Sequence, residues 1–182
     1  MSTPGTPGTP GSAGTPASNT LLLRRQLTEL TRHPLEGFSA GLVDENDLYE
    51  WEILIIGPPD TLYEGGFFKA RLSFPKTFPL EPPKMRFITP MWHPNIYPED
   101  GVVCISILHA PGEDQYGYED AGERWMPVHT VESILVSVIS LLSSDSPNPD
   151  SPANLDAAIQ VRNDLAGYKK KVRRLVRQTQ EE

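Results

Sequence analysis

The first regular pattern in the chain is a run of leucines at helical spacing. Leu23, Leu27 and Leu30 recur at intervals that place them on one face of a helix. Charged side chains occupy the other face, namely Arg24, Arg25, Glu29 and Arg32. Pro34 disfavours helical backbone at the residue before it. The pattern therefore predicts an amphipathic helix over residues 20–32.

Four apolar or alternating runs follow, and each is short enough to form a strand. They cover residues 38–43, 48–56, 66–74 and 84–88. The third run, GFFKARLSF, alternates apolar and polar residues, which is typical of a strand with one buried face. Because the links between the runs are short, we expect neighbouring strands to pair in an antiparallel meander.

After the fourth run the alternation of apolar and polar residues ends, and a helical pattern of apolar residues begins only after Thr130. Residues 89–129 form a long stretch without a clear period, and such a loop in a compact domain usually has a function. Thr130 is a typical N-cap, and the very apolar residues after it predict the central buried helix. Residues 153–178 predict one or two helices, broken near Asn163 or Gly167. The order of elements predicts an α+β domain.

Composition divides the chain into a tail and a domain. Residues 1–18 consist almost entirely of Ser, Thr, Pro, Gly and Ala, so we expect a disordered tail. Residues 19–182 are numerous enough to bury a core without disulfides or metals. The net charge of −8 argues against general nucleic-acid binding. No apolar run is long enough to cross a membrane, and no secretory signal pattern is present.

Cys104 is the only cysteine, which excludes a disulfide within the chain and a zinc site of several thiolates. A lone cysteine is most often a small buried apolar residue. Short motifs on both sides of Cys104 argue for another role, and they are YEGGFF at 63–68, FPLEPPK at 78–84, WHPNI at 92–96, GVVCI at 101–105 and WMP at 125–127. These motifs, in this order, resemble the ubiquitin-conjugating enzymes over roughly residues 19–178.

The resemblance implies the α+β fold of that family and a carrier that holds ubiquitin as a thioester on Cys104. The chemistry agrees, because a cysteine is both a good nucleophile and a good leaving group. An ordinary cysteine pKa of about 8.5 leaves some thiolate at neutral pH. The resemblance gives Asn95 two comparable roles, stabilising the oxyanion or ordering the loop. It implies a structural role for His93, in preference to general-base catalysis. Pro94 is expected to fix the turn.

The segment between Cys104 and Trp125 is long for the family and acidic. The string HAPGEDQYGYE, with SPAN at 151–154, resembles the G class, which implies an enzyme that builds degradation-signalling ubiquitin chains. Five carboxylates follow the nucleophile closely, namely Glu113, Asp114, Glu119, Asp120 and Glu123. We expect them to hold the incoming lysine or to help remove its proton, rather than to be only a solvated loop.

Two further sets of residues follow from the family pattern. Many members place an Asp beside the incoming lysine, and here Asp145, Asp150 and Ser151 remain alternatives for that position. The resemblance also implies a surface for a RING-type ligase, formed by Arg24, Arg25, Leu80, Met126 and Pro127. Arg124 is expected to contact bound ubiquitin or the ligase.

Two other classes of protein compete with the carrier. A non-catalytic ubiquitin-binding relative would lack the cysteine, so Cys104 argues against it. A cysteine hydrolase using Cys104, His93 and Asn95 would have to activate water, whereas a carrier must keep water from its thioester. The family motifs favour the carrier.

The resemblance also implies the partners and the compartment. We expect ubiquitin, the activating enzyme and a RING-type ligase as partners, with neither nucleic acid nor direct membrane insertion. ATP and nucleotide binding are suggested as features of the pathway, with ATP consumed upstream by the activating enzyme and neither metal nor cofactor bound to this chain. A reduced cysteine favours cytoplasm or nucleus, and recruitment to the ER membrane by a partner stays open.

Overall fold

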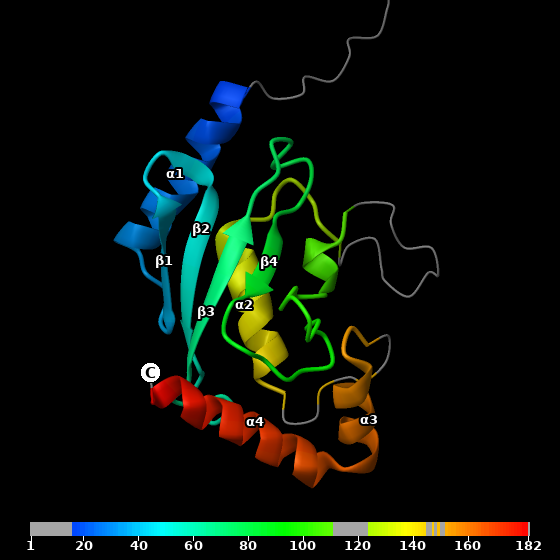
Figure 1. Cartoon of the computed structure of the whole chain (residues 1–182). Helices are drawn as coiled ribbons and strands as arrows, with labels where there is room; N and C mark the ends of the chain where they lie inside the picture. Colours follow the sequence, from blue (N-terminus) through cyan, green and yellow to red (C-terminus); the bar gives the residue numbers. More distant parts are fainter. Residues whose placement is uncertain (1–15, 111–123, 145–146, 148, 150–151, 182) are drawn as a thin grey trace, which may run out of the picture.

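The computed structural model describes residues 16–110, 124–144, 147, 149 and 152–181. Its strands are β1 (Phe38–Asp44), β2 (Asp47–Ile56), β3 (Phe67–Ser73) and β4 (Lys84–Phe87). Its helices are α1 (Pro16–Arg32), the 3-10 turn η1 (Ser106–Leu108), α2 (Val131–Leu142), α3 (Leu155–Asn163) and α4 (Leu165–Gln180). Helices α1 and α2 lie on the same face of the sheet, and α4 crosses one end of it beside α3 (Figure 1).

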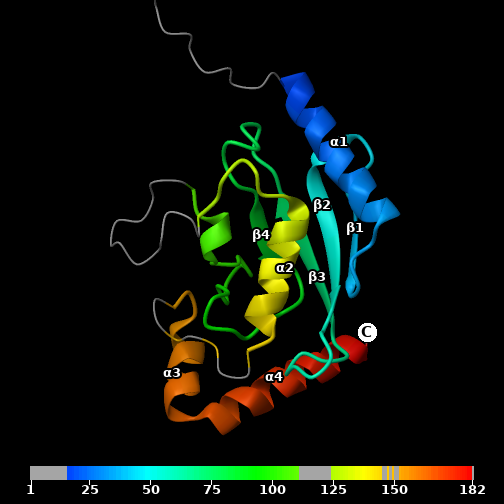
Figure 2. The same cartoon turned by 180° about the vertical axis from the view of Figure 1, so that it is seen from behind.

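The four strands pair antiparallel in the order β1-β2-β3-β4, which confirms the predicted meander and the α+β class. Every strand end lies within one residue of its predicted position. Alternate residues of β2 point to opposite faces, so Trp51 and Ile53 are fully buried while Glu52 is exposed. The buried face of the sheet packs against α2, which lies in front of it when the molecule is seen from behind (Figure 2).

Helix α1 begins four residues earlier than predicted, at Pro16 rather than at residue 20. Residues 16–19 have no apolar periodicity, so the pattern gives no sign of this extra turn. Asn19 is buried there, and its side-chain amide donates a 2.9 Å hydrogen bond to the carbonyl oxygen of Lys76. A contact with a distant loop therefore stabilises the first turn. The predicted apolar face is confirmed, since Leu23 is fully buried.

The N-cap predicted for the central helix is confirmed. The hydroxyl of Thr130 accepts a 3.2 Å hydrogen bond from the Ser133 backbone N–H, and the hydroxyl of Ser133 accepts a 2.9 Å hydrogen bond from the Thr130 backbone N–H. This reciprocal pair satisfies two backbone donors that the start of a helix leaves open. Both Ile134 and Leu135 of α2 are fully buried, so this helix forms the centre of the core.

The C-terminal residues form two helices, with the break at Asp164, between the two predicted positions. Asp164 ends α3 and caps α4, because its carboxylate accepts a 3.0 Å hydrogen bond from the Gly167 backbone N–H. A β-carbon at Gly167 would lie 2.1 Å from that carboxylate, so the glycine makes room for the cap. The predicted tail at 1–18 lies mostly outside the described residues.

Candidate active site

A tight turn brings Cys104 to the edge of the sheet, beside β4. Gly101 has φ +77°, a conformation that side chains rarely allow, and a β-carbon there would lie 2.1 Å from the Phe87 carbonyl oxygen. The next residues run beside β4, since Val103 donates a 3.0 Å hydrogen bond to the carbonyl of Met85. Cys104 itself donates a 2.8 Å backbone hydrogen bond to the carbonyl of Asn95. The turn and this bond place the nucleophile next to the His-Pro-Asn segment.

His93 is buried and held in its neutral form. Its Nδ1 accepts a 3.0 Å hydrogen bond from the Asn95 backbone N–H, which requires an unprotonated nitrogen. Burial lowers the pKa of His93 from 6.5 to about 4, although the backbone of Leu141 favours the charged form. These contacts favour the structural role proposed for His93. They also tie the Asn95 backbone, which in turn holds Cys104.

The residues around the His-Pro-Asn segment fasten it to α3 and α4. The Pro94 carbonyl accepts hydrogen bonds from the backbone N–H groups of Ala153 (2.8 Å) and Asn154 (3.0 Å). The indole N–H of Trp92 donates a 2.8 Å hydrogen bond to Gln160 of α3, and the Lys171 ammonium lies 3.2 Å above the centre of the same ring. The loop carrying Asn95 is therefore fixed by contacts from the C-terminal third of the chain.

Two buried tyrosines hold the backbone at Trp92. The hydroxyls of Tyr63 and Tyr168 donate to the Trp92 carbonyl at 3.2 Å and 3.5 Å. Burial raises the pKa of Tyr168 to about 12 and that of Tyr63 well above 10, so both hydroxyls keep their protons at neutral pH. Donation to Trp92 is thus independent of pH in the physiological range.

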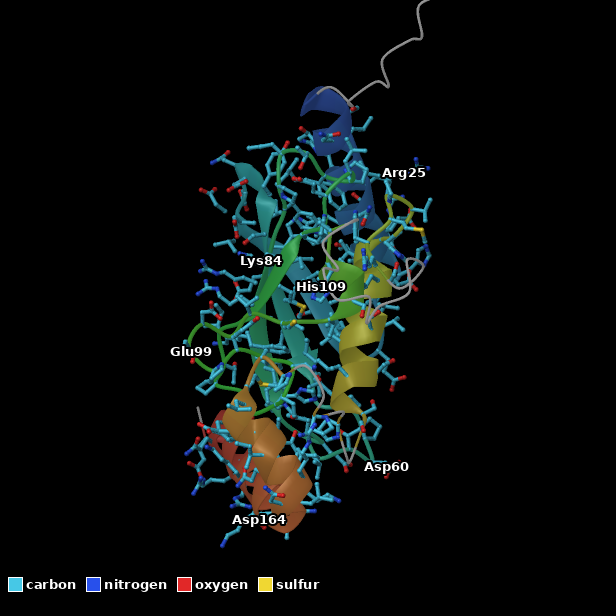
Figure 3. The ribbon with its side chains drawn as sticks, turned by 90° about the vertical axis from the view of Figure 1, so that its right-hand side faces the viewer. Arg25, Asp60, Lys84, Glu99, His109 and Asp164 are labelled. Carbon is cyan, nitrogen blue, oxygen red and sulfur yellow. The ribbon has the colours of Figure 1, made fainter. Side chains whose placement is uncertain are left out.

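His109 contacts the nucleophile, although the sequence does not single it out as a site residue. Its Nε2 lies 3.5 Å from Sγ of Cys104, within range of a hydrogen bond that involves sulfur. The intervening residues form η1, a turn within the stretch predicted to lack regular structure. The only sequence signal is a histidine five residues after the cysteine, and that spacing has meaning only once the 3-10 turn is known. Figure 3 shows His109 beside this turn.

The other predicted site residues either lie outside the described part of the chain or lie on its surface. The five acidic residues at 113–123, together with Asp145, Asp150 and Ser151, lie outside the described residues. Arg124 is described and partly buried. The residues proposed for ligase binding are all exposed, and they are Arg24, Arg25, Leu80, Met126 and Pro127.

Within the described part of the chain, no group of three or more His, Cys, Asp or Glu side chains could hold a metal ion. Likewise, no described helix is both long and apolar enough to cross a membrane.

The arrangement suits acyl transfer through a thioester. The thiol is partly exposed, and the loop beside it is fixed by backbone and side-chain hydrogen bonds. The family model described as ubiquitin-conjugating enzyme matches residues 22–176. The chain belongs to the ubiquitin-conjugating enzyme family.

Individual proteins that are similar in sequence to this ubiquitin-conjugating enzyme support the same family assignment. The chain is 63% identical over 158 residues to ubiquitin-conjugating enzyme E2 15 of Schizosaccharomyces pombe, covering 87% of this chain and 93% of the relative. It is 52% identical over 157 residues to ubiquitin-conjugating enzyme E2 G2 of Bos taurus, covering 86% of this chain and 93% of that protein. The solved structure of human ubiquitin-conjugating enzyme E2 G1 matches with a TM-score of 0.62 and 62% identity, covering 71% of this chain and 98% of that one. The predicted membership of the G class is confirmed.

Family membership fixes the type of reaction. The chain is a transferase that carries ubiquitin as a thioester on Cys104, its only cysteine, and its partners are ubiquitin, an activating enzyme and a ligase. The hydrolase and the non-catalytic binding protein are thereby set aside. The suggestion of ATP and nucleotide binding is wrong for the chain itself, because enzymes of this family do not bind ATP.

Proposed function

We propose that this enzyme works with a RING-type ligase to build ubiquitin chains that direct proteins to the proteasome. The observation that carries the proposal is a pair of exposed apolar side chains on two connected loops. Leu80 is 52% exposed and Met126 is 39% exposed, so both are available to a partner. The residues next to them are joined directly, since the indole N–H of Trp125 donates a 2.8 Å hydrogen bond to the Pro79 carbonyl.

Helix α1 is joined to the start of α2, the helix that follows the loop of Met126. The side-chain oxygen of Gln26 accepts a 2.9 Å hydrogen bond from the Val131 backbone N–H, at the start of α2. Arg25 precedes Gln26 and is exposed. A groove of about 370 Å³ follows this junction, lined by Leu22, Arg25, Glu29, Leu30 and residues at the start of α2. An exposed apolar pair is typical of a protein-binding surface, and Arg25 adds a cation to the groove between α1 and α2.

The acidic residues that follow Cys104 support a role in choosing the acceptor. Five carboxylates lie within twenty positions of the thioester-forming cysteine. A lysine ammonium must lose a proton before it attacks a thioester, and carboxylates can hold the ammonium or take part in that transfer. The degradation-signalling linkage follows from the resemblance to the G class.

We place the reaction in the cytoplasm or nucleus, because carrying a thioester requires Cys104 to stay reduced. Recruitment to the ER membrane, where it occurs, would come through a partner protein. No bound cofactor is needed by this chain, since the activating enzyme consumes the ATP.

The ligase proposal can be tested with the charged enzyme. Leu80→Ala and Met126→Ala should accept ubiquitin from the activating enzyme normally but lose about tenfold of the discharge stimulated by a RING domain. Ile159→Ala removes a similarly exposed side chain, 47% accessible, on α3 and serves as the matched control. Equal stimulation of all three variants would contradict the proposed surface.

The linkage and the acidic residues call for a second assay. Charged enzyme mixed with single-lysine ubiquitins should use mainly the lysine whose chains the proteasome recognises. A variant with Glu113, Asp114, Glu119, Asp120 and Glu123 changed to their amides should still form the reductant-sensitive thioester but extend chains slowly. Chain extension at the wild-type rate would show that these carboxylates do not act on the acceptor.

A further inference from the structure

His109 has a contact that the carrier reaction does not yet explain. Its Nε2 lies 3.5 Å from Sγ of Cys104, the atom that must become a nucleophile. The chain has four histidines, and the others serve elsewhere. His93 accepts a hydrogen bond from Asn95, His129 lies 5.5 Å from Trp125 measured between ring centres, and His33 is exposed at the end of α1.

The backbone of His109 is fixed on both sides, so the contact is built into the fold. Its N–H donates a 3.0 Å hydrogen bond to the Ser106 carbonyl, which closes the η1 turn. Its carbonyl accepts a 3.0 Å hydrogen bond from the N–H of Trp125, a residue only 1% exposed. One turn and one buried anchor therefore fix the backbone from which the imidazole reaches the sulfur.

The backbone of Cys104, the other residue in this contact, is also fixed. The Cys104 backbone N–H donates to the Asn95 carbonyl at 2.8 Å, which fixes the point from which the side chain leaves the main chain. Sγ of Cys104 lies 3.5 Å from Nε2 of His109, and the charged residues on the neighbouring described segments include Arg124, before the anchoring Trp125, and Glu132 in the first turn of α2. An imidazole nitrogen at this distance can accept the thiol proton.

We propose that His109 is a catalytic residue that removes the Cys104 thiol proton when the enzyme is charged with ubiquitin. The S–H bond breaks and the proton moves to Nε2, which gives an imidazolium beside a thiolate. The thiolate forms a bond to the C-terminal carbonyl of ubiquitin, and the bond between that carbonyl and the activating enzyme's cysteine breaks. The second sulfur leaves as a thiolate, and His109 passes its proton to it or to water.

His109 and His93 differ in how far they are exposed and in what their ring nitrogens contact. His93 is 1% exposed and its Nδ1 already accepts a backbone hydrogen bond, so it cannot exchange protons with the substrate. His109 is only partly buried, and its Nε2 points at the reacting atom. An imidazolium next to a thiolate favours the thiolate, as in other cysteine enzymes with a paired histidine.

The single cysteine makes a direct test possible, because alkylation of the full chain by iodoacetamide reports on Cys104 alone. His109→Ala should slow alkylation at pH 7 by about threefold to tenfold and move the midpoint of its pH profile upward. His109→Gln should behave like His109→Ala, because an amide can hydrogen-bond to sulfur but cannot take up the proton. Asn163→Ala, an exposed change at the end of α3, should match the wild-type enzyme.

Charging measured in a single turnover completes the test. Both His109 variants should form the ubiquitin thioester slowly at pH 7 and recover most of the wild-type rate near pH 8.5, where the thiol ionises unaided. Thermal unfolding of each variant would separate a folding defect from a chemical one. An unchanged alkylation profile, a charging defect that persists at pH 8.5, or full rescue by glutamine would each overturn the proposal.

Discussion

The indole N–H of Trp125 donates a 2.8 Å hydrogen bond to the carbonyl oxygen of Pro79, across 46 positions of sequence. Trp125 is buried, and its ring also packs on Phe78 with 5.8 Å between ring centres. The same residue donates its backbone N–H to His109. One residue thus connects the proline-rich loop, the loop that carries Met126 and the histidine beside the nucleophile.

We expect Trp125→Phe to weaken ligase-stimulated discharge more than it weakens charging. The change leaves the Pro79 carbonyl without its donor and should cost about 1–3 kcal/mol of unfolding free energy. Because Leu80 and Met126 then lose their common support, a RING domain should stimulate discharge less. Discharge rates measured with and without the ligase would show this.

Trp51→Phe is the matched control for that experiment. Trp51 is also fully buried, and its indole N–H also donates a 2.8 Å hydrogen bond to a carbonyl, that of Leu48. It should lose comparable stability in urea unfolding but keep the normal response to the ligase. A similar loss of response in both variants would mean that stability, and not the loop connection, controls discharge.

His93 should make stability depend on pH below neutrality. Its pKa is lowered from 6.5 to about 4 in the folded protein, so below pH 6.5 the unfolded chain binds a proton that the folded chain does not. Stability therefore falls as pH decreases from about 6.5 to about 4, by about 3 kcal/mol in total. Above pH 6.5 both states are neutral and this contribution is constant.

The measurement is urea unfolding between pH 7 and pH 4. His93→Gln should be less stable at pH 7 but should show a flatter decline in this window. His33→Gln, at an exposed position, should retain the full decline. If the slope of His93→Gln equals that of the wild type, other groups cause the pH dependence.

Gly101→Ala should disturb the approach to Cys104. The position has φ +77°, and the added β-carbon would meet the Phe87 carbonyl oxygen at 2.1 Å. Strained backbone of this kind costs about 1–3 kcal/mol, and the clash adds to it. We expect lower stability and slower charging. Gly41→Ala, on β1, meets no atom within 4 Å and should leave charging unchanged.

Periodicity and capping predict the scaffold because those signals are local. The leucine spacing that includes Leu23 locates α1, and Thr130 locates the start of α2. The first turn of α1 was missed because its partner, Lys76, lies 57 positions away. The motifs around Asn95 and Cys104 identify the reaction, since the chemistry demands those residue types. The contact of His109 depends on a 3-10 turn and on Trp125, and neither has a sequence period.

The cation over Trp92 provides a last test of how the active-site loop is anchored. Lys171→Met keeps the apolar stem but removes the ammonium that lies 3.2 Å from the centre of the Trp92 ring. Such contacts contribute about 0.5–2 kcal/mol, so we expect a loss of stability of that size and slower discharge to lysine, because Trp92 holds the loop that carries Asn95. Lys170→Met makes the same change at an exposed neighbour and should alter neither. Equal behaviour of the two variants in thermal unfolding and discharge would show that the ring is held sufficiently by its hydrogen bond to Gln160.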